Sequence, residues 1–92
     1  MNYGNYFAKL WSSKRPDLTM TSFARELGVT QPFVKQIEMN IRSPRKEMRD
    51  KMIRILGLKG KECDDFIYNS ILFRLDDSDE GDMIRLQRKG YF

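Results

Sequence analysis

The chain has 92 residues, of which 40% are hydrophobic and 33% are charged, and its net charge is +4 at neutral pH. This length suits one small domain with a modest core, and the composition is that of an ordinary soluble protein. No apolar stretch is long enough to span a bilayer, because Arg74 interrupts the longest candidate directly after Phe73.

The residue types present argue against catalysis. The sequence has no histidine, which removes the commonest general base and a common metal ligand. The single cysteine, Cys63, cannot form an internal disulfide, and this fits a reducing compartment. The N-terminus has no basic start followed by an apolar stretch, so we see no secretion signal. We therefore expect a cytoplasmic protein that is not an enzyme, with no cofactor and no metal.

The charge is unevenly distributed along the chain. Residues 1–60 contain 12 Lys and Arg against 5 Asp and Glu, a net +7, whereas residues 61–92 contain 5 against 8, a net −3. A basic N-terminal body favours a polyanionic partner such as nucleic acid. A basic surface that is merely solvated remains the alternative at this point.

The first predicted helix follows from one apolar stripe. The helix must end before Pro16, because a residue that precedes proline disfavours the helical region. Lys14 and Arg15 lie near its end, where cations complement the helix dipole. The stripe has the spacing i, i+3, i+4, i+7, i+8 and consists of Tyr3, Tyr6, Phe7, Leu10 and Trp11.

A second and a third helix are predicted on either side of a tight turn at residues 28–30. Thr19 is expected to cap the second helix, and Gly28 to end it in the left-handed conformation. Thr30 is expected to cap the third helix, which runs to about Met39. Asn40 then closes that helix, because asparagine tolerates the left-handed region better than most residues.

Two further helices are predicted before residue 76. Ser43 and Pro44 read as a cap followed by proline at the first helical position, so a fourth helix is expected to begin there and to stop at Gly57. The fifth helix opens with acidic residues and carries more apolar surface than one small core needs. Its inner stripe is Cys63, Phe66, Ile67, Ser70 and Ile71, and the surplus is Tyr68, Leu72, Phe73 and Leu75.

The C-terminal part is predicted less clearly. Residues 76–82 read as an acidic loop, and residues 83–89 as either a short helix or a strand. The acidic loop is a poor match to a calcium loop, because Gly81 occupies a ligand position. We therefore predict a helix-turn-helix domain over residues 1–75 and a tail over residues 76–92 that serves dimerisation or partner binding.

The middle of the chain resembles the lambda-repressor/Cro-like helix-turn-helix family, also called the xenobiotic-response-element type. The match covers about residues 5–58 and consists of many residues at fixed spacing. Phe23 replaces the usual Leu, and Asn40 the usual Gly. The matching positions are Thr19, Phe23, Ala24, Leu27, Gly28, Val29, Thr30, Val34, Ile37, Glu38, Asn40 and Pro44.

The resemblance implies an all-α, compact bundle of five helices whose third helix lies in the major groove of DNA. It assigns base contacts to Gln31, Pro32, Lys35 and Gln36. Glutamine can bond adenine bidentately and lysine can bond guanine, although Lys35 could reach a phosphate instead, and Pro32 could touch only a thymine methyl. It assigns phosphate contacts to Thr19, Met20, Asn40, Arg42 and Arg45, with Lys14 or Arg15 as a loose addition. For Glu38 it implies a tie between the third helix and the following loop.

By the same resemblance, the protein is expected to be a sequence-specific transcriptional regulator, of a kind common in phages and mobile elements of bacteria. We expect a repressor that binds a palindromic operator as a homodimer. The proposed dimer interface is Tyr68, Leu72, Phe73 and Leu75, with Met83, Ile84, Leu86 and Tyr91 as further members. Two alternatives stay open: the tail folds back on the fifth helix of the same monomer, or the protein is an antitoxin or antirepressor whose acidic C-terminal part grips a partner protein.

Overall fold

The computed structural model describes residues 2–73 and 80–91, and these residues form six α-helices without a strand. The expected all-α class is therefore confirmed. The helices are α1 (Tyr3–Lys14), α2 (Met20–Leu27), α3 (Gln31–Glu38), α4 (Lys46–Leu56), α5 (Lys61–Phe73) and α6 (Glu80–Arg88).

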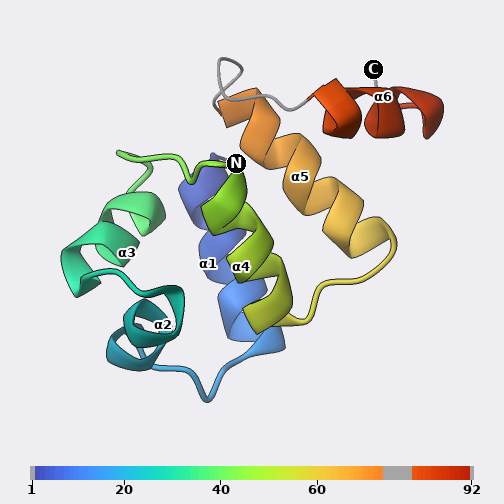
Figure 1. The fold of residues 1–92 in the computed structure, drawn as a ribbon. Helices are drawn as coiled ribbons and strands as arrows, with labels where there is room; N and C mark the ends of the chain where they lie inside the picture. The colour runs from blue at the N-terminus through green and yellow to red at the C-terminus, as the bar shows by residue number, and fades with distance from the viewer. Residues whose placement is uncertain (1, 74–79, 92) are drawn as a thin grey trace.

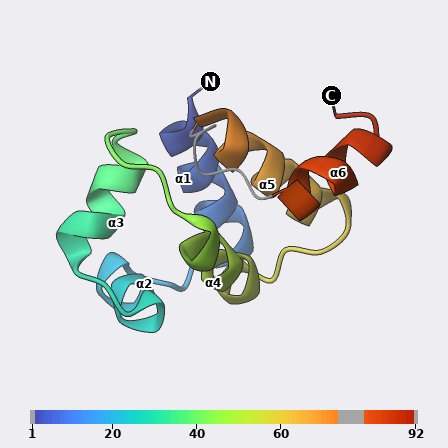
Figure 2. The same ribbon diagram turned by 45° about the horizontal axis from the view of Figure 1, so that its top comes forward.

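Two helices form the centre of the molecule, and the other four lie on either side of them. Figure 1 shows α1 and α4 next to each other in the middle, with α2 and α3 on one side and α5 and α6 on the other. The turned view in Figure 2 keeps α3 and α6 at opposite ends of the molecule. The proposed reading helix and the C-terminal helix are thus well separated.

The main core is built where the amphipathic faces of the first five helices meet. The predicted stripe of α1 is confirmed, because Tyr3 and Phe7 are buried and the rest of the stripe packs against the same core. Trp11 also donates its indole N–H to the Leu18 carbonyl at 2.7 Å, which ties the end of α1 to the loop before α2. The other buried members of this core are Leu18, Phe23, Ala24, Leu27, Val34, Ile37, Met52, Leu56, Leu58 and Phe66.

The start of α4 was predicted wrongly. The helix begins at Lys46 rather than at Ser43–Pro44, and Arg45 is its N-cap residue with extended angles of φ −79° and ψ 169°. Pro44 is fully buried. Because its ring is held against the core, Pro44 does not start the helix, and Arg45 after it is still extended before the backbone coils at Lys46.

The tail forms a helix, and that helix starts earlier than expected. Residues 80–82, assigned above to an acidic loop, belong to the first turn of α6. Leu86 is completely buried and packs with Ile67 and Ile71 of α5 in a second small apolar cluster. Of the expected acidic loop, residues 76–79 lie outside the described residues, as does the proposed domain boundary between residues 75 and 76.

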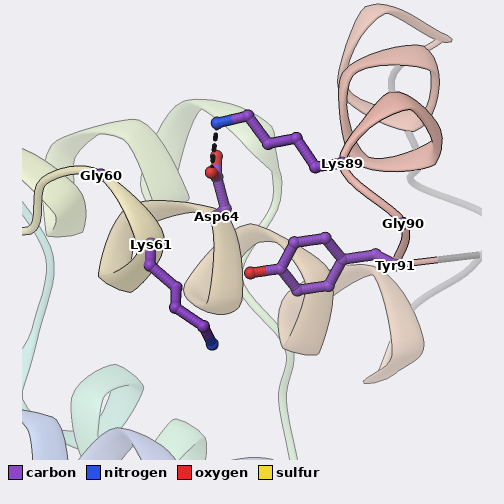
Figure 3. Close-up of a pocket in the computed structure, with 6 residues that line it drawn as sticks. All are labelled: Gly60, Lys61, Asp64, Lys89, Gly90 and Tyr91. Carbon is purple, nitrogen blue, oxygen red and sulfur yellow. Dashed lines mark hydrogen bonds and ion pairs between the residues drawn. The ribbon is translucent and has the colours of Figure 1, made fainter.

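Ion pairs accompany this packing of α6. Asp64 of α5 is only 3% exposed, and its carboxylate lies 2.6 Å from Arg85 and 2.5 Å from Lys89, both from the C-terminal half of the chain. Figure 3 shows Lys89 reaching across to Asp64, with Tyr91 beside them. Asp82 of α6 lies 3.4 Å from Arg49 of α4, whose side chain is 1% exposed. Asp64 and Arg49, the buried charges among the described residues, thus find opposite charges within α6 or directly after it.

The proposed dimer residues are partly engaged inside the monomer. The Tyr68 ring lies 5.0 Å from that of Tyr91, and the Phe73 ring stacks on that of Tyr3 at 5.3 Å. Leu72 is exposed, as is Ile84 on α6. Met83 and Leu86 pack against α5, and Leu75 lies outside the described residues. The dimer interface stays a prediction, with Leu72 as its most accessible described member.

Candidate nucleic-acid interface

A rigid elbow joins α2 to α3. Gly28 ends α2 in the left-handed conformation, with φ +77° and ψ 30°, which the expected glycine tolerates without strain. The Val29 N–H donates to the Ala24 carbonyl at 2.9 Å and closes the turn. Because Leu27 on one side of the turn and Val34 on the other are both buried, the angle between the two helices is fixed by the core.

The other face of α3 carries the predicted base-contacting side chains. Gln31, Pro32 and Lys35 are exposed, and Gln36 is half-buried. Gln31 Nε2 donates to the Thr21 hydroxyl at 2.7 Å, and Lys35 pairs with Glu38 at 3.1 Å. The contact of Glu38 thus lies one turn back along α3, and its expected tie to the loop stays a prediction. The structure thus gathers all four predicted base-contacting residues on one short helix.

The end of α3 is organised around an asparagine. Asn40 has φ +63°, as expected for the residue that closes this helix, and its side-chain oxygen accepts the Gly4 N–H at 3.1 Å. The contact is possible only because α1 approaches very closely here, since a Cβ on Gly4 would lie 2.3 Å from the Glu38 carbonyl oxygen. The side-chain oxygen of Asn40 therefore ties α3 to α1.

The predicted phosphate-contacting residues lie at the edges of α3. The Thr19 hydroxyl accepts the Ser22 N–H at 3.1 Å, so Thr19 caps α2 as expected. Met20 is the first residue of α2, and its N–H is among those that a helix leaves unpaired. Arg45 is exposed at the start of α4, and Arg42 is exposed in the segment that joins α3 to α4.

The two cations at the end of α1 have partners elsewhere. Lys14 pairs with Glu62 of α5. Arg15 donates to the Ile55 carbonyl at 3.1 Å and pairs with Asp17 at 3.3 Å. Hydrogen bonding to Arg15 lowers the pKa of the exposed Asp17 carboxyl. These contacts direct both cations towards α4, α5 and the loop before α2.

A family comparison agrees with this geometry. A helix-turn-helix family model of the Cro/C1 type matches residues 14–62, from the last residue of α1 to the first turn of α5. The chain belongs to this family. As a Cro/C1-type helix-turn-helix protein it is a DNA-binding transcription regulator, and the resemblance read from the sequence is confirmed. The comparisons with curated proteins and with solved structures found no match.

The described residues contain no membrane-spanning helix and no group of metal ligands. Among the described helices none has both the length and the apolar content to cross a membrane. In residues 2–73 and 80–91 no three His, Cys, Asp or Glu side chains are grouped as metal ligands. A cavity of about 450 Å³ is bordered by both members of the Asp64–Lys89 ion pair, together with Gly60, Lys61, Gly90 and Tyr91.

Sequence reasoning missed the role of Arg49. It was counted in the basic excess of residues 1–60, yet it is buried beneath α6 and adds little to a DNA-facing surface. Arg49 follows Met48 in the sequence, and this position alone does not indicate that the arginine is buried. Only the partner Asp82, 33 residues further along, shows that this cation belongs to the interior.

Proposed function

We propose that this Cro/C1-type regulator is a repressor that binds a palindromic operator as a homodimer, with α3 of each copy in the major groove. The observation that supports it best is the exposed outer face of α3, held by the elbow at one end of the molecule (Figure 1). A DNA-bound domain of this size would act by covering the operator and blocking polymerase.

The proposed contacts follow from side-chain chemistry. Gln31, Pro32, Lys35 and Gln36 face base edges, where a good bidentate contact discriminates by about 1–3 kcal/mol. Thr19, Met20, Asn40, Arg42 and Arg45 face the flanking phosphates, which position the protein without reading sequence. Of the last group, Asn40 already uses its side-chain oxygen within the monomer, so its amide nitrogen would make the contact.

The homodimer is proposed because a single α3 reaches few base pairs. Two copies on a palindrome would place their reading helices about one helical turn apart, ~34 Å. Leu72, near the C-terminal end of α5, and Ile84 of α6 are the candidate contacts between copies.

The operator preference is expected to depend on the glutamines of α3. Replacing Gln31 and Gln36 together by Ala should abolish preference for the operator and leave weak binding to any duplex, because the phosphate contacts remain. Gln87→Ala, which removes an exposed glutamine from α6, is the matched control and should change nothing. Titrating each variant against labelled operator and scrambled duplexes measures its preference for the operator. A double variant that still prefers the operator would show that α3 is not the reading helix.

A cation at the edge of α3 should act on all sequences alike. Arg45→Ala is expected to weaken binding to operator and scrambled duplex by the same factor and to reduce the salt slope by about one. Arg88→Ala removes an exposed cation from α6, at the opposite end of the molecule, and should leave the slope unchanged. The measurement is affinity across a series of salt concentrations, and an unaltered slope for Arg45→Ala would remove that phosphate contact.

The experiment that tests the whole proposal is selection of bound duplexes from a random pool. An enriched inverted repeat supports both sequence reading and dimeric binding. An enriched site without symmetry would sink the palindromic dimer, and a pool that stays random would sink sequence-specific regulation.

No observation favours the alternative of an antitoxin or antirepressor that grips a partner protein. It relied on the acidic residues of the C-terminal part, and several of them pair within the chain. Glu62 contacts Lys14, Asp64 contacts Arg85 and Lys89, and Asp82 contacts Arg49.

A further inference from the structure

The segment that follows α3 folds back onto the helix. The N–H groups of Ile41 and Arg42 both donate to the Gln36 carbonyl, at 2.8 and 3.2 Å. The left-handed Asn40 makes this reversal possible. Arg42 therefore starts from a backbone position that is fixed relative to the last turn of α3.

The side chain of Arg42 is held by two further contacts with α3. Its Nε–H donates to the Gln36 side-chain oxygen at 2.9 Å. Its guanidinium carbon lies 5.0 Å from the centre of the Phe33 ring, within the range of a cation–π interaction. Although Arg42 is exposed, its guanidinium thus lies against two side chains of α3 and is oriented before any ligand arrives.

This arrangement leaves one edge of the guanidinium available. Within the described residues, Nε is the Arg42 side-chain nitrogen that makes a hydrogen bond, so the Nη1 and Nη2 donors remain to bind a ligand. A planar pair of N–H donors fits two adjacent acceptors, as on the O6/N7 edge of guanine or on a phosphate.

The same hydrogen bond restricts what Gln36 can read. Bidentate reading of adenine needs the glutamine oxygen to accept from N6 and the amide nitrogen to donate to N7. In this structure the oxygen already accepts from Arg42. Gln36 could make both adenine contacts only if this one oxygen accepted from Arg42 and from adenine N6 at the same time.

We propose that Arg42 is a specificity-determining residue that reads a guanine in the major groove, and that Gln36 and Phe33 are positioning residues that orient it. The proposal rests on the proposed function, because it needs α3 in the groove. It changes the partner of Arg42 from phosphate to base, and the role of Gln36 from base contact to positioning residue. A guanine is favoured over a phosphate because the contacts hold the guanidinium beside the outer face of α3. A side chain that only anchors a phosphate would need no such orientation.

Two variants at Arg42 separate base reading from phosphate binding. After selection of the wild-type site, Arg42→Ala should lose preference for guanine at one position of each half-site, with a loss of roughly 5- to 150-fold against that site. Arg42→Lys keeps the charge but lacks the planar fork, so it should keep the salt slope and lose part of the guanine preference, because a lysine can still bond guanine but without the fork. If Arg42→Ala weakens all duplexes equally and Arg42→Lys restores them, Arg42 is a phosphate contact and the proposal fails.

Variants of Gln36 test the positioning role. Gln36→Ala should relax preference at the same base pair as Arg42→Ala, and the double variant should be no worse than Arg42→Ala alone. Gln36→Glu keeps an acceptor for Arg42 Nε, so it should preserve the guanine preference even though its negative charge lowers affinity for every duplex. Loss of preference at a different base pair in Gln36→Ala would mean that Gln36 reads a base itself, and this would overturn its assigned role.

These outcomes are distinguishable from failure of the proposed function. A wild-type protein that enriches no sequence removes sequence-specific binding altogether, and the assignment of Arg42 with it. A clear wild-type site whose guanine preference survives in both Arg42 variants removes only the assignment of Arg42.

Discussion

Asp82→Ala is expected to lower the free energy of unfolding by roughly 3 kcal/mol or more, because removing one partner of a buried ion pair leaves the other charge uncompensated. The remaining charge would be Arg49, whose side chain is 1% exposed and whose Nη1 already has no hydrogen-bond partner among the described residues. Such a loss is a large fraction of the stability of a small domain. Urea denaturation followed by circular dichroism measures it.

Asp50→Ala is the matched control for this effect. Asp50 lies 3.6 Å from Lys46, which also lies 3.8 Å from Asp82, but its side chain is 54% exposed. An exposed pair contributes about 0–1 kcal/mol, so this variant should stay close to the wild type. Equal effects of the two substitutions would contradict the ion-pair explanation.

A second variant tests whether the uncompensated charge is the cause. Adding Arg49→Met to Asp82→Ala should recover much of the lost stability, because a buried ion pair can be replaced by apolar groups of similar volume at little cost. If the double variant is no more stable than Asp82→Ala, α6 is held by other contacts, such as the buried Leu86.

Gly4→Ala is expected to destabilise the protein, although alanine is favoured over glycine within helices by about 1 kcal/mol. Gly4 is buried in α1, and a Cβ there would lie 2.3 Å from the Glu38 carbonyl oxygen and 2.9 Å from the Asn40 backbone nitrogen. Both neighbours are backbone atoms, so α1 would have to move away from the end of α3. Overpacking of this kind costs about 1–3 kcal/mol. Thermal unfolding shows directly whether the substitution raises or lowers the stability of the protein.

Gly81→Ala provides the comparison for Gly4→Ala. Gly81 is exposed in α6, so alanine there should be neutral or stabilising by up to about 1 kcal/mol. Because Gly4 also supports Asn40 and the segment that carries Arg42, Gly4→Ala should weaken operator preference as well as stability. A stabilised Gly4→Ala protein would show that the two helices are not in close contact.

Local patterns in the sequence were enough to predict most of the helices and the elbow. The stripe of α1 repeats with the helical period, Thr19 has the hydroxyl that a cap needs, and Gly28 has no Cβ to oppose a left-handed conformation. Gly57 ends α4 for the same reason. Each of these signals acts over a few residues, so it can be read without knowing the fold.

The sequence predicted where the candidate site lies, on α3, but not the contacts among its side chains. A family motif was enough to place Gln31 and Gln36 in α3, outside its buried residues Val34 and Ile37. The contact between Gln36 and Arg42 was not predicted, because it depends on the rotamers of two flexible side chains across a turn. The family resemblance therefore assigned Arg42 a phosphate contact and did not indicate how its guanidinium is oriented.

By itself, the amino-acid sequence determined the class of the fold, the helix-turn-helix and the family, because helical periods, caps and turn residues are local properties of the chain. Only the tertiary structure decided that α6 covers α5, that Arg49 belongs to the interior, and that Pro44 delays the start of α4. Those features depend on partners far away along the chain, as with Arg49 and Asp82, which are 33 residues apart. A buried charge has the same letter in the sequence as an exposed one, and only the packing around it determines which of the two it is.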